Sequence, residues 1–278
     1  MAYPSSFNIA MALPTKSFVF ILFLLAAMLL ECQASVAHIK HPKPKFMPGP
    51  WKKAHATFYQ GNDASFDLLK GGACGYEDIG KEGYGKGTVA VSTPLFNNGS
   101  ICGACYEIKC TENPQYCHPE HSLIVTATNL CPPSQNQATE NGGWCNPPRE
   151  HFDIAYPAFN EIAEYTAGIV SIDYRRVPCQ KQGGIRFTIT GNPYFNLVSV
   201  WNVGGAGDVV KMLVKGNKKL KWTEMTRNWG QKWQTDAMMV GESLTFRVGT
   251  SDGRTSTSWH VVPENWQFGQ TFEGKNFK

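Results

Sequence analysis

The segment Cys102-Gly-Ala-Cys-Tyr-Glu-Ile-Lys-Cys110 brings three cysteines close together. Five more cysteines flank it, so that eight lie between Cys74 and Cys179. Clustered cysteines favour either a metal site or a disulfide framework. A structural zinc site usually needs a second close pair, often with histidine, and Cys131 and Cys145 do not supply one. The spacing therefore favours disulfides, provided that the protein occupies an oxidising compartment.

The N-terminus indicates that compartment. Lys16 precedes a run of 14 uncharged residues, Ser17 to Leu30, and a polar stretch with small residues follows, Glu31 to Ala37. A basic flank, an apolar core and small residues are typical of a secretory signal peptide, which we place at residues 1–37. The alternative is a membrane anchor, but the run is shorter than the roughly 20 apolar residues that a span requires. We therefore expect a secreted, extracellular protein without stable membrane insertion, from which Cys32 has been removed.

Outside the cell, an even number of cysteines predicts structural disulfides. Spacing alone favours only the two local pairs, Cys110–Cys117 and Cys131–Cys145, and leaves the other pairings open. We expect no metal ion and no cofactor, because free thiolates rarely persist outside the cell and the chain has no P-loop.

The composition excludes other classes of protein. Hydrophobic residues make up 42% of the 278 residues and charged residues 17%, so the chain can bury a sizeable core and is not generally disordered. The net charge of +4 is too small to indicate nucleic-acid binding. The Gly-x-Ser-x-Gly motif of serine hydrolases is absent from the sequence.

The cysteines also divide the chain into two predicted domains. Residues 185–278 contain no cysteine, six of the eight tryptophans, and 12 basic against 7 acidic residues. Residues 38–184 carry 13 basic and 14 acidic residues, and the polar linker Gln180–Gly184 separates the two parts. We expect an extended N-terminal arm at 38–54, a disulfide-bonded domain at 55–184 and a second domain at 185–278.

Strand patterns dominate both predicted domains. Short β-branched runs bounded by turn residues occur at 122–128, 168–174, 184–190, 196–203, 209–215 and 243–248. Short strands at this spacing predict an all-β protein made of sandwiches or barrels. One helix is expected at Pro157–Tyr165, with Phe159, Ile162 and Ala163 on its apolar face.

One tripeptide, His151-Phe-Asp153, contains residue types that are common in catalytic and binding sites. It follows a Gly- and Pro-rich loop, Gly142 to Pro148, and precedes the predicted helix. A carboxyl group at such a junction can face a cleft and act as a general acid, or it can cap the helix. Inverting glycoside hydrolysis needs two carboxyl groups, and the spacing of the sequence identifies no partner for Asp153.

Eleven motifs resemble those of the plant alpha-expansins, in order along nearly all of the chain after residue 54. They are HATFY (55–59), GGACGY (71–76), CGACYEIKC (102–110), GGWCNPP (142–148), HFD (151–153), YRRVPC (174–179), GGIRFTI (183–189), NVGGAGDV (202–209), RNWGQKW (227–233), TSDGRT (250–255) and FGQTF (268–272). GGWCNPP and the linker CQKQGG (179–184) favour the alpha over the beta branch.

The resemblance implies a fold and a disulfide pairing. The first domain should be a six-stranded double-psi β-barrel similar to family 45 endoglucanases, and the second an immunoglobulin-like β-sandwich. The family pairing, transferred to the matching cysteines, is Cys74–Cys102, Cys105–Cys179, Cys110–Cys117 and Cys131–Cys145.

The resemblance also implies a function. The family loosens plant cell walls at acid pH by disturbing non-covalent contacts between cellulose and matrix glucans such as xyloglucan, without hydrolysis. Asp153 matches the endoglucanase general acid, and Thr57, Tyr59 and His151 are expected beside it in the groove. The catalytic base of the hydrolases is missing from the family pattern, and the neutral Asn129 supplies none. We therefore expect a monomeric protein of the plant cell wall that is not an enzyme.

Aromatic residues of the second domain are expected to bind the polysaccharide. Phe195 and Trp229 match the family's stacking platform, with Tyr194 and Trp201 as neighbours. For Trp222, Trp233 and Trp266, we expect positions in the core of the sandwich.

Several features lie outside the family pattern or leave alternatives. Glu77-Asp78 stands where most members have Gly-Asn, and the loop 62–70 is longer than usual and contains Asp67. These extra carboxylates keep a weak endoglucanase with Asp153 as its acid as the alternative function. A purely structural wall-binding protein of barwin type is a further alternative, but such proteins are a single barrel. Asn98 begins a glycosylation sequon, Asn-Gly-Ser.

Overall fold

The computed structural model describes residues 45–59 and 72–277. The expected signal peptide, the first part of the expected arm (38–44) and the loop 62–70 lie outside the described residues. Strand β1 begins at Lys52, within the segment expected to be an arm.

Within the described residues, no helix combines the length and the apolar character that crossing a membrane would require.

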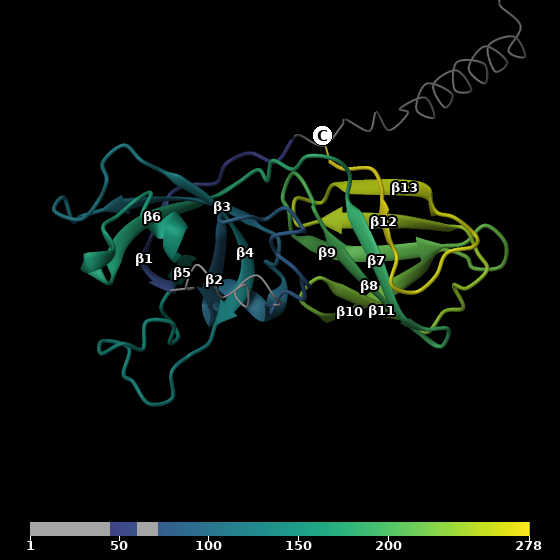
Figure 1. The fold of residues 1–278 in the computed structure, drawn as a ribbon, viewed down its shortest axis with the longest axis horizontal. Coiled ribbons are helices and arrows are strands. Elements are labelled where there is room, and N and C mark those ends of the chain that lie inside the picture. The colour runs from purple at the N-terminus through teal and green to yellow at the C-terminus, as the bar shows by residue number, and fades with distance from the viewer. Residues whose placement is uncertain (1–44, 60–71, 278) are drawn as a thin grey trace, which may run out of the picture. The chain divides into compact units, whose positions relative to one another are not determined.

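Six strands form a closed barrel (Figure 1). They are β1 (Lys52–Tyr59), β2 (Thr88–Ser92), β3 (Cys105–Thr111), β4 (Leu123–Cys131), β5 (His151–Ala155) and β6 (Val170–Val177), in the order β1-β5-β2-β4-β3-β6. The pairs β1–β5 and β2–β4 are parallel, and the other pairs are antiparallel. Parallel pairing of β1 with β5 aligns the motif HATFY with the motif HFD, which are far apart in the sequence.

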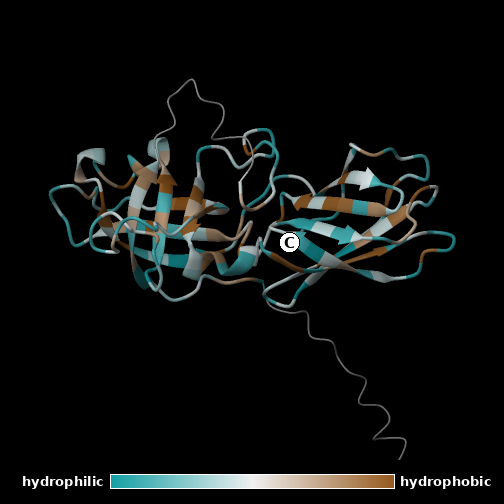
Figure 2. Ribbon diagram, turned by 90° about the horizontal axis from the view of Figure 1, so that it is seen from below, coloured by the Kyte–Doolittle hydropathy of each residue, from teal (hydrophilic) through white to brown (hydrophobic). Residues whose placement is uncertain are grey.

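Alternation along the strands fills the barrel with apolar side chains. In β1, Ala54 and Ala56 are buried in the core, while His55 and Thr57 point to the other face. In β5, Phe152 and Ile154 take the inward positions and are fully buried. Brown, hydrophobic residues accordingly gather on the strands of the ribbon, where white and teal residues interrupt them (Figure 2). The same alternation places the polar residues of both strands side by side on the outer face.

Eight further strands form the second, sandwich part of the chain. They are β7 (Arg186–Asn192), β8 (Phe195–Trp201), β9 (Val209–Lys215), β10 (Thr223–Trp229), β11 (Lys232–Thr235), β12 (Leu244–Thr250), β13 (Thr255–Val262) and β14 (Thr271–Glu273), in the order β13-β12-β9-β10-β11-β8-β7-β14. Strand β10 pairs with β9 through its first half and with β11 through its second, so it joins two halves of the sheet. Phe187 and Phe246 stack in the core between these halves, with ring centroids 4.7 Å apart.

The helical content is lower than expected. The helices are α2 (Thr93–Phe96) and α3 (Tyr156–Phe159), and the 3-10 turns are η2 (Asn97–Gly99) and η3 (Tyr165–Ala167). The prediction of a helix over 157–165 was therefore wrong beyond residue 159. Ile162 and Ala163 are buried as expected, but the chain forms a β-bridge here between Ala163 and Cys117, in which Glu164 N–H donates to the carbonyl of Tyr116 and His118 N–H to the carbonyl of Ile162.

All four expected disulfides are present. They join Cys74 to Cys102, Cys105 to Cys179, Cys110 to Cys117 and Cys131 to Cys145. This confirms the disulfide prediction, including the pairings that spacing had left open.

Residues of the barrel and the sandwich meet through backbone contacts. Cys179 and Gly205 exchange two backbone hydrogen bonds as an isolated antiparallel bridge. Gly207 has a φ of +80°, and a Cβ atom there would lie 2.2 Å from the carbonyl oxygen of Gly103. Only glycine fits such a close approach in this left-handed conformation. Gln231 adds a side-chain hydrogen bond of 2.7 Å to the carbonyl of Cys102.

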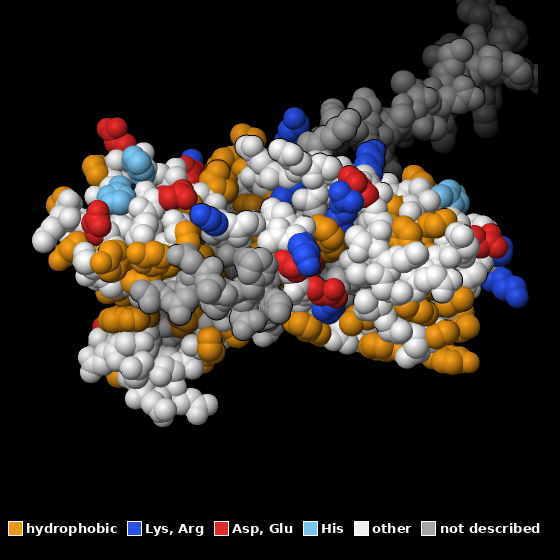
Figure 3. Space-filling model, in the orientation of Figure 1, with side chains coloured by type: hydrophobic (Ala, Val, Ile, Leu, Met, Phe, Trp, Pro, Cys, Tyr) orange, Lys and Arg blue, Asp and Glu red, His pale blue; other side chains and the backbone are white. Residues whose placement is uncertain are grey.

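Charged side chains are dispersed over the face of the molecule seen in Figure 3. Lys and Arg side chains are interspersed with Asp and Glu side chains there. Lys232 and Glu77 form one of the ion pairs of the described residues, at 3.4 Å. Neither sign of charge dominates this face.

Candidate functional site

A chain of three polar side chains lies on the outer face of β1 and β5. The parallel register pairs Thr57 with Asp153 and His55 with His151. The Thr57 hydroxyl donates to Asp153 Oδ1 at 2.9 Å, and its oxygen lies 2.8 Å from His151 Nε2. Because the hydroxyl has a single proton, the His151 Nε2–H must donate to Thr57 when Thr57 donates to Asp153. The structure thus brings Thr57, His151 and Asp153 together, although only Thr57 and Asp153 line the groove.

His151 is the fixed end of this chain. The imidazole is fully buried, and burial together with the nearby His55 and Arg149 lowers its pKa to about 3. Its Nδ1 has no partner among the described residues, as suits a neutral ring protonated on Nε2. The backbone N–H of His151 donates to Ser92 Oγ at 3.0 Å, which anchors the residue further. His151 therefore stays neutral at mildly acidic pH and acts only as a donor to Thr57.

Asp153 is the titratable end. Burial raises the pKa of its carboxyl group above the usual range, and the hydrogen bond from Thr57 opposes part of that rise. Asp153 lies within β5, and the residue that precedes helix α3 is Ala155. The alternative that Asp153 caps a helix was therefore wrong. Its carboxyl group is instead directed into a groove.

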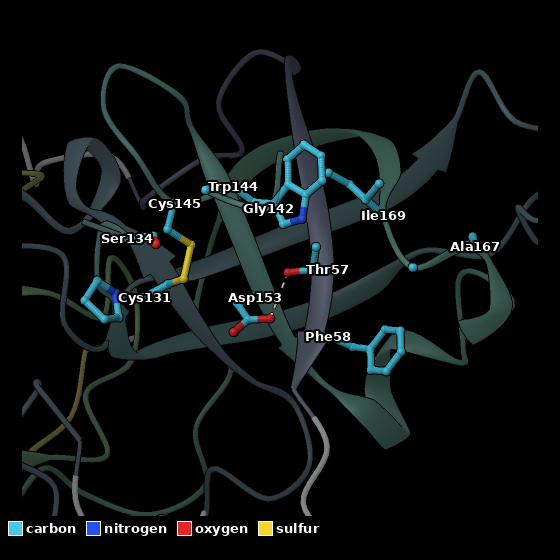
Figure 4. A pocket seen from close by; sticks show the side chains of 13 residues that line it. Thr57, Phe58, Cys131, Ser134, Gly142, Trp144, Cys145, Asp153, Ala167 and Ile169 are labelled. Carbon is cyan, nitrogen blue, oxygen red and sulfur yellow. Dashed lines mark hydrogen bonds between the residues drawn. A yellow bond between two sulfur atoms is a disulfide. The ribbon is translucent and has the colours of Figure 1, made fainter. Parts of the chain in front are cut away.

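The groove has a volume of about 510 Å³. Its walls are partly aromatic and apolar, with Trp144, Ile169 and Phe58 among the lining residues, and the Cys131–Cys145 disulfide lies on the same side as the Asp153 carboxyl group in the view of Figure 4. Among the described residues that line the groove, Asp153 is the only ionisable side chain. In such a groove, the carboxyl group can form hydrogen bonds with the hydroxyls of a sugar, while the sugar rings pack against the apolar and aromatic side chains.

Tyr59 lies near Asp153, and Trp144 adds a residue that was not expected. Tyr59 is two positions beyond Thr57 on β1 and is not among the described residues that line the groove. Its hydroxyl is 3.4 Å from Thr88 Oγ1, and its pKa is raised by burial and by the charge of the nearby Asp153. Trp144 lines the groove, but no role was predicted for it from the sequence. Its motif, GGWCNPP, was recognised only as a family marker, although an aromatic side chain in a loop rich in glycine is itself typical of a binding site.

A second candidate site lies on the sandwich. Tyr194 is 78% exposed, Phe195 41% and Trp229 44%. Trp229 pairs with Lys232 on β11, which pairs with Ser199 on β8, and the Lys232 ammonium lies 5.9 Å from the centroid of the Trp229 ring. Lys232 also donates to Ser199 Oγ at 2.8 Å, so these side chains share one face of the sheet.

Alternation extends this face along β8. Phe195 lies four positions before Ser199 and Trp201 two positions after it, so their side chains point to the same side of the strand. Trp201 is half-buried and donates from Nε1 to Thr188 Oγ1 at 3.1 Å, so it supports the face more than it offers stacking area. We call Tyr194, Phe195 and Trp229 the aromatic platform.

The other tryptophans are split between core and surface. Trp233 and Trp266 are buried, as expected. The prediction that Trp222 belongs to the core was wrong, because it directly precedes β10 and is only half-buried, on the outer side of the sheet. Asn98 is exposed at φ +52°, so its sequon is accessible in the folded protein.

Two acidic residues outside the family pattern, Glu77 and Asp78, do not line the groove. Glu77 pairs with Lys232 at 3.4 Å, and Asp78 pairs with Lys81 at 3.3 Å. Neither lines the groove beside Asp153. Asp63 and Asp67 lie outside the described residues.

Comparisons with known proteins agree with this architecture. The model of the Expansin C-terminal domain matches residues 185–263, and the DPBB_1 model, described as lytic transglycolase, matches residues 88–174. Expansin-A32 of Oryza sativa subsp. japonica is 61% identical over 259 residues, which cover 92% of this chain and 95% of that relative. Expansin-A22 of Arabidopsis thaliana is 51% identical over 225 residues, covering 81% and 78%.

Two solved structures resemble the fold at low sequence identity. The apo expansin of Clavibacter michiganensis has a TM-score of 0.60 and 17% identity, covering 82% of this chain and 97% of its own. A mutant of the same protein in complex with cellohexaose has a TM-score of 0.59 and 17% identity, covering 81% and 96%. Together with the domain models, these likenesses confirm a double-psi β-barrel followed by a β-sandwich.

Proposed function

This chain belongs to the plant alpha-expansin family, and from that premise we propose that it loosens the plant cell wall by disturbing non-covalent contacts between cellulose and matrix glucans. The observation that carries the proposal is the groove, in which one carboxyl group, that of Asp153, stands without a second ionisable side chain among the described lining residues. Such a groove can hold a sugar chain, and its described lining residues offer no base to activate water.

The residues next to the groove support the proposed absence of hydrolysis. Asn129 follows the strand segment Thr126–Thr128, but its Oδ1 accepts hydrogen bonds from the backbone N–H groups of Ala73 and Leu130. This amide is neutral and occupied by backbone, so it is not available as a base. The expected alternative, a weak endoglucanase, would need a carboxylate where Asn129 stands or elsewhere in the groove.

Asp153 is proposed to give the protein its response to acid. A protonated carboxyl group both donates and accepts hydrogen bonds, whereas a carboxylate only accepts them. Because burial raises the pKa of Asp153, the protonated form persists to higher pH than for an exposed aspartate. In an acidic wall, the group would exchange hydrogen bonds with glucan hydroxyls that otherwise bind a neighbouring chain. Thr57 and His151 would hold it in place.

The aromatic platform is proposed to bind cellulose. Tyr194, Phe195 and Trp229 present exposed rings on which the C–H faces of glucose units can stack. The mutant Clavibacter expansin was solved with cellohexaose, a fragment of cellulose, which supports this choice of ligand. We further propose that the protein acts as a monomer in the cell wall, and that xyloglucan is among the matrix glucans whose contacts it disturbs.

The test is the creep of heat-killed wall strips under constant load, with reducing sugar measured in the same bath. Wild-type protein should extend the strips at about pH 4.5, much less at about pH 7, and release no sugar at either pH. Asp153→Asn should lose most of the creep and still bind cellulose. Asp236→Asn is the matched control, because Asp236 is an exposed aspartate of the sandwich, and it should behave as wild type. Sugar release that depends on Asp153 and parallels creep would contradict the proposal.

A further inference from the structure

The sandwich carries a second aromatic group, made by Trp259 of β13 and by Trp222, which directly precedes β10, beside Arg247 of β12 and Lys215 of β9. Trp259 of β13 is 59% exposed, and its ring centroid lies 5.9 Å from that of Trp222, with the ring planes at 69°. The Arg247 guanidinium carbon lies 4.3 Å from the centroid of the Trp222 ring, and the Lys215 ammonium lies 6.0 Å from the centroid of each indole. We call these four residues the Trp222–Trp259 face.

The cations of this face are not neutralised. Neither Lys215 nor Arg247 forms an ion pair with a carboxylate of the described residues. Arg247 Nε donates to Thr257 Oγ1 at 3.1 Å, which fixes the plane of the guanidinium while its terminal nitrogens have no partner among the described residues. The loop before Trp222 adds Lys219 and Lys221, both exposed and also without a described acidic partner.

The nearest acidic residue on the same strands does not cancel this charge. Glu224 of β10 pairs with Lys211 of β9 at 2.8 Å, so one negative charge is matched by one positive charge. Lys218 of the same loop pairs with Glu264. The Trp222–Trp259 face thus keeps an excess of positive charge beside aromatic rings.

The aromatic platform differs from this face in charge. The lysine beside Trp229, Lys232, is held by Ser199 at 2.8 Å and faces Glu77 at 3.4 Å. The side chains of Asn228 and Gln234, which hydrogen-bond to each other on the same half of the sheet, are neutral amides. A neutral glucan therefore suits the platform, and it would leave the cations of the other face unused.

The geometry of the Trp222–Trp259 face favours one class of polysaccharide. Two rings close to perpendicular do not form a flat surface for crystalline cellulose, but they can hold one sugar ring of a single chain. A planar guanidinium fixed over one ring binds a carboxylate through two parallel hydrogen bonds. Sugar rings that carry a carboxylate, the uronates, satisfy both requirements.

We propose that the Trp222–Trp259 face is a second polysaccharide-binding site, which takes a single chain of an acidic, uronate-bearing polysaccharide. The sugar ring stacks on Trp259 or Trp222, and its carboxylate binds Arg247, with Lys215 adding attraction. The site is independent of cellulose binding by the aromatic platform and of the groove that contains Asp153.

Binding to polygalacturonate is the direct test, measured by affinity gel electrophoresis at two salt concentrations. Arg247→Gln should weaken binding about tenfold, as expected for the loss of one charge-assisted interaction. Trp259→Ala should weaken it roughly three- to tenfold through the loss of stacking. Arg247→Lys keeps the charge but not the planar fork, so it should lie between Arg247→Gln and wild type. Lys86→Gln removes one exposed positive charge from the barrel and should bind as wild type.

Cellulose binding by the same proteins separates this proposal from the proposed function. Arg247→Gln and Trp259→Ala should pull down with crystalline cellulose as wild type does, which also shows that they are folded. Phe195→Ala/Trp229→Ala should lose cellulose and keep polygalacturonate. Equal losses for Lys86→Gln and Arg247→Gln would overturn the proposal, because they would indicate attraction by net charge alone. So would equally tight binding to anionic lipid vesicles or to duplex DNA, or unchanged binding of both variants of the face.

Discussion

The hydroxyl oxygen of Thr57 lies 2.8 Å from His151 Nε2 and 2.9 Å from Asp153 Oδ1, so one side chain connects a buried neutral imidazole to a carboxyl group in the groove. The connection depends on the parallel pairing of β1 with β5, which aligns residues 57 and 153. The directions of the two hydrogen bonds are linked, because the Thr57 hydroxyl has a single proton. When that proton is donated to Asp153, the neutral imidazole of His151 must donate its Nε2–H to Thr57.

Removal of this hydroxyl should raise the pKa of Asp153 further. The Thr57 bond is the contribution that lowers this pKa against the effect of burial, so Thr57→Val leaves burial unopposed. The variant should also lose about 1–3 kcal/mol of stability, because the buried His151 Nε2–H loses its acceptor. The measurement is the titration of the Asp153 carboxyl carbon by NMR. Thr57→Ser keeps the hydroxyl and should titrate as wild type, and an unchanged or lower pKa in Thr57→Val would contradict the proposed hydrogen-bond direction.

His151 should make the barrel less stable as the solution becomes acidic. Its pKa is about 3 in the folded protein, against 6.5 for an ordinary histidine. Between these two pH values, His151 is therefore protonated in the unfolded chain and neutral in the folded one. The stability that this residue contributes is complete above pH 6.5 and declines as the pH falls towards 3. His151→Gln should therefore show a smaller loss of unfolding free energy between about pH 7 and 4.5 than wild type. The comparison is made by denaturant titration, and an identical loss in both proteins would count against the buried neutral state.

Glu82 should have the opposite effect. Burial raises its pKa from 4.5 to about 7, and its Oε2 has no partner among the described residues. A raised pKa means that the folded chain prefers the protonated form, so stability declines as the pH rises from 4.5 to 7. Glu82→Gln should gain a few degrees in melting temperature relative to wild type at about pH 7.5, and close to none at about pH 4. A gain that is equal at both pH values would show that ionisation of Glu82 is not the cause.

The disulfide framework should leave no free thiol among the eight cysteines from 74 to 179. Replacement of Cys131 and Cys145 together by serine should cost about 3 kcal/mol in the chain-entropy model for a loop of this length. It should also loosen the groove wall, since both residues line it. Thiol titration of the denatured mature protein tests the first part. Two reactive cysteines would contradict it.

The aromatic platform should account for most cellulose binding. Phe195→Ala/Trp229→Ala removes two exposed rings that add little to the core, so the melting temperature should stay within a few degrees of wild type while pull-down with crystalline cellulose falls strongly. Trp201→Phe is the matched control, because Trp201 is half-buried and mainly supports the face. Near-normal pull-down by the double variant would place the cellulose site elsewhere.

Much of the fold could be predicted from the sequence, because hydrophobic alternation and turn residues act locally. The run 209–215 coincides with β9, and the neighbouring runs deviate from their strands by one to three residues at each end. The helix over 157–165 could not be predicted correctly from its apolar spacing, since buried Ile162 and Ala163 serve a β-bridge equally well. The non-local disulfides needed the family resemblance, because spacing carries no information about Cys105 and Cys179.

The candidate site could likewise be predicted only in part. That Asp153, Thr57 and His151 belong together was expected, but their hydrogen-bond order depends on a strand register that no local pattern contains. Trp144 was overlooked because its loop has no periodicity, and Trp222 was assigned to the core wrongly because the sequence at the end of a strand does not indicate on which side of the sheet the flanking side chain lies. Each of these depends on which strands become neighbours.

The bridge between Cys179 and Gly205 has a consequence for biosynthesis. A ribosome delivers the chain from its N-terminus, so Cys179, the last cysteine, is made before any strand of the sandwich. Oxidative pairing within the barrel therefore requires nothing that is still to be translated, and a ribosome paused within the sandwich leaves a nascent chain whose barrel can already be fully cross-linked. When Gly205 arrives, it meets a partner residue already tethered to Cys105. The sandwich can in this way be added to a finished template, and a truncation within it should be secreted as an oxidised barrel rather than retained as a mispaired one.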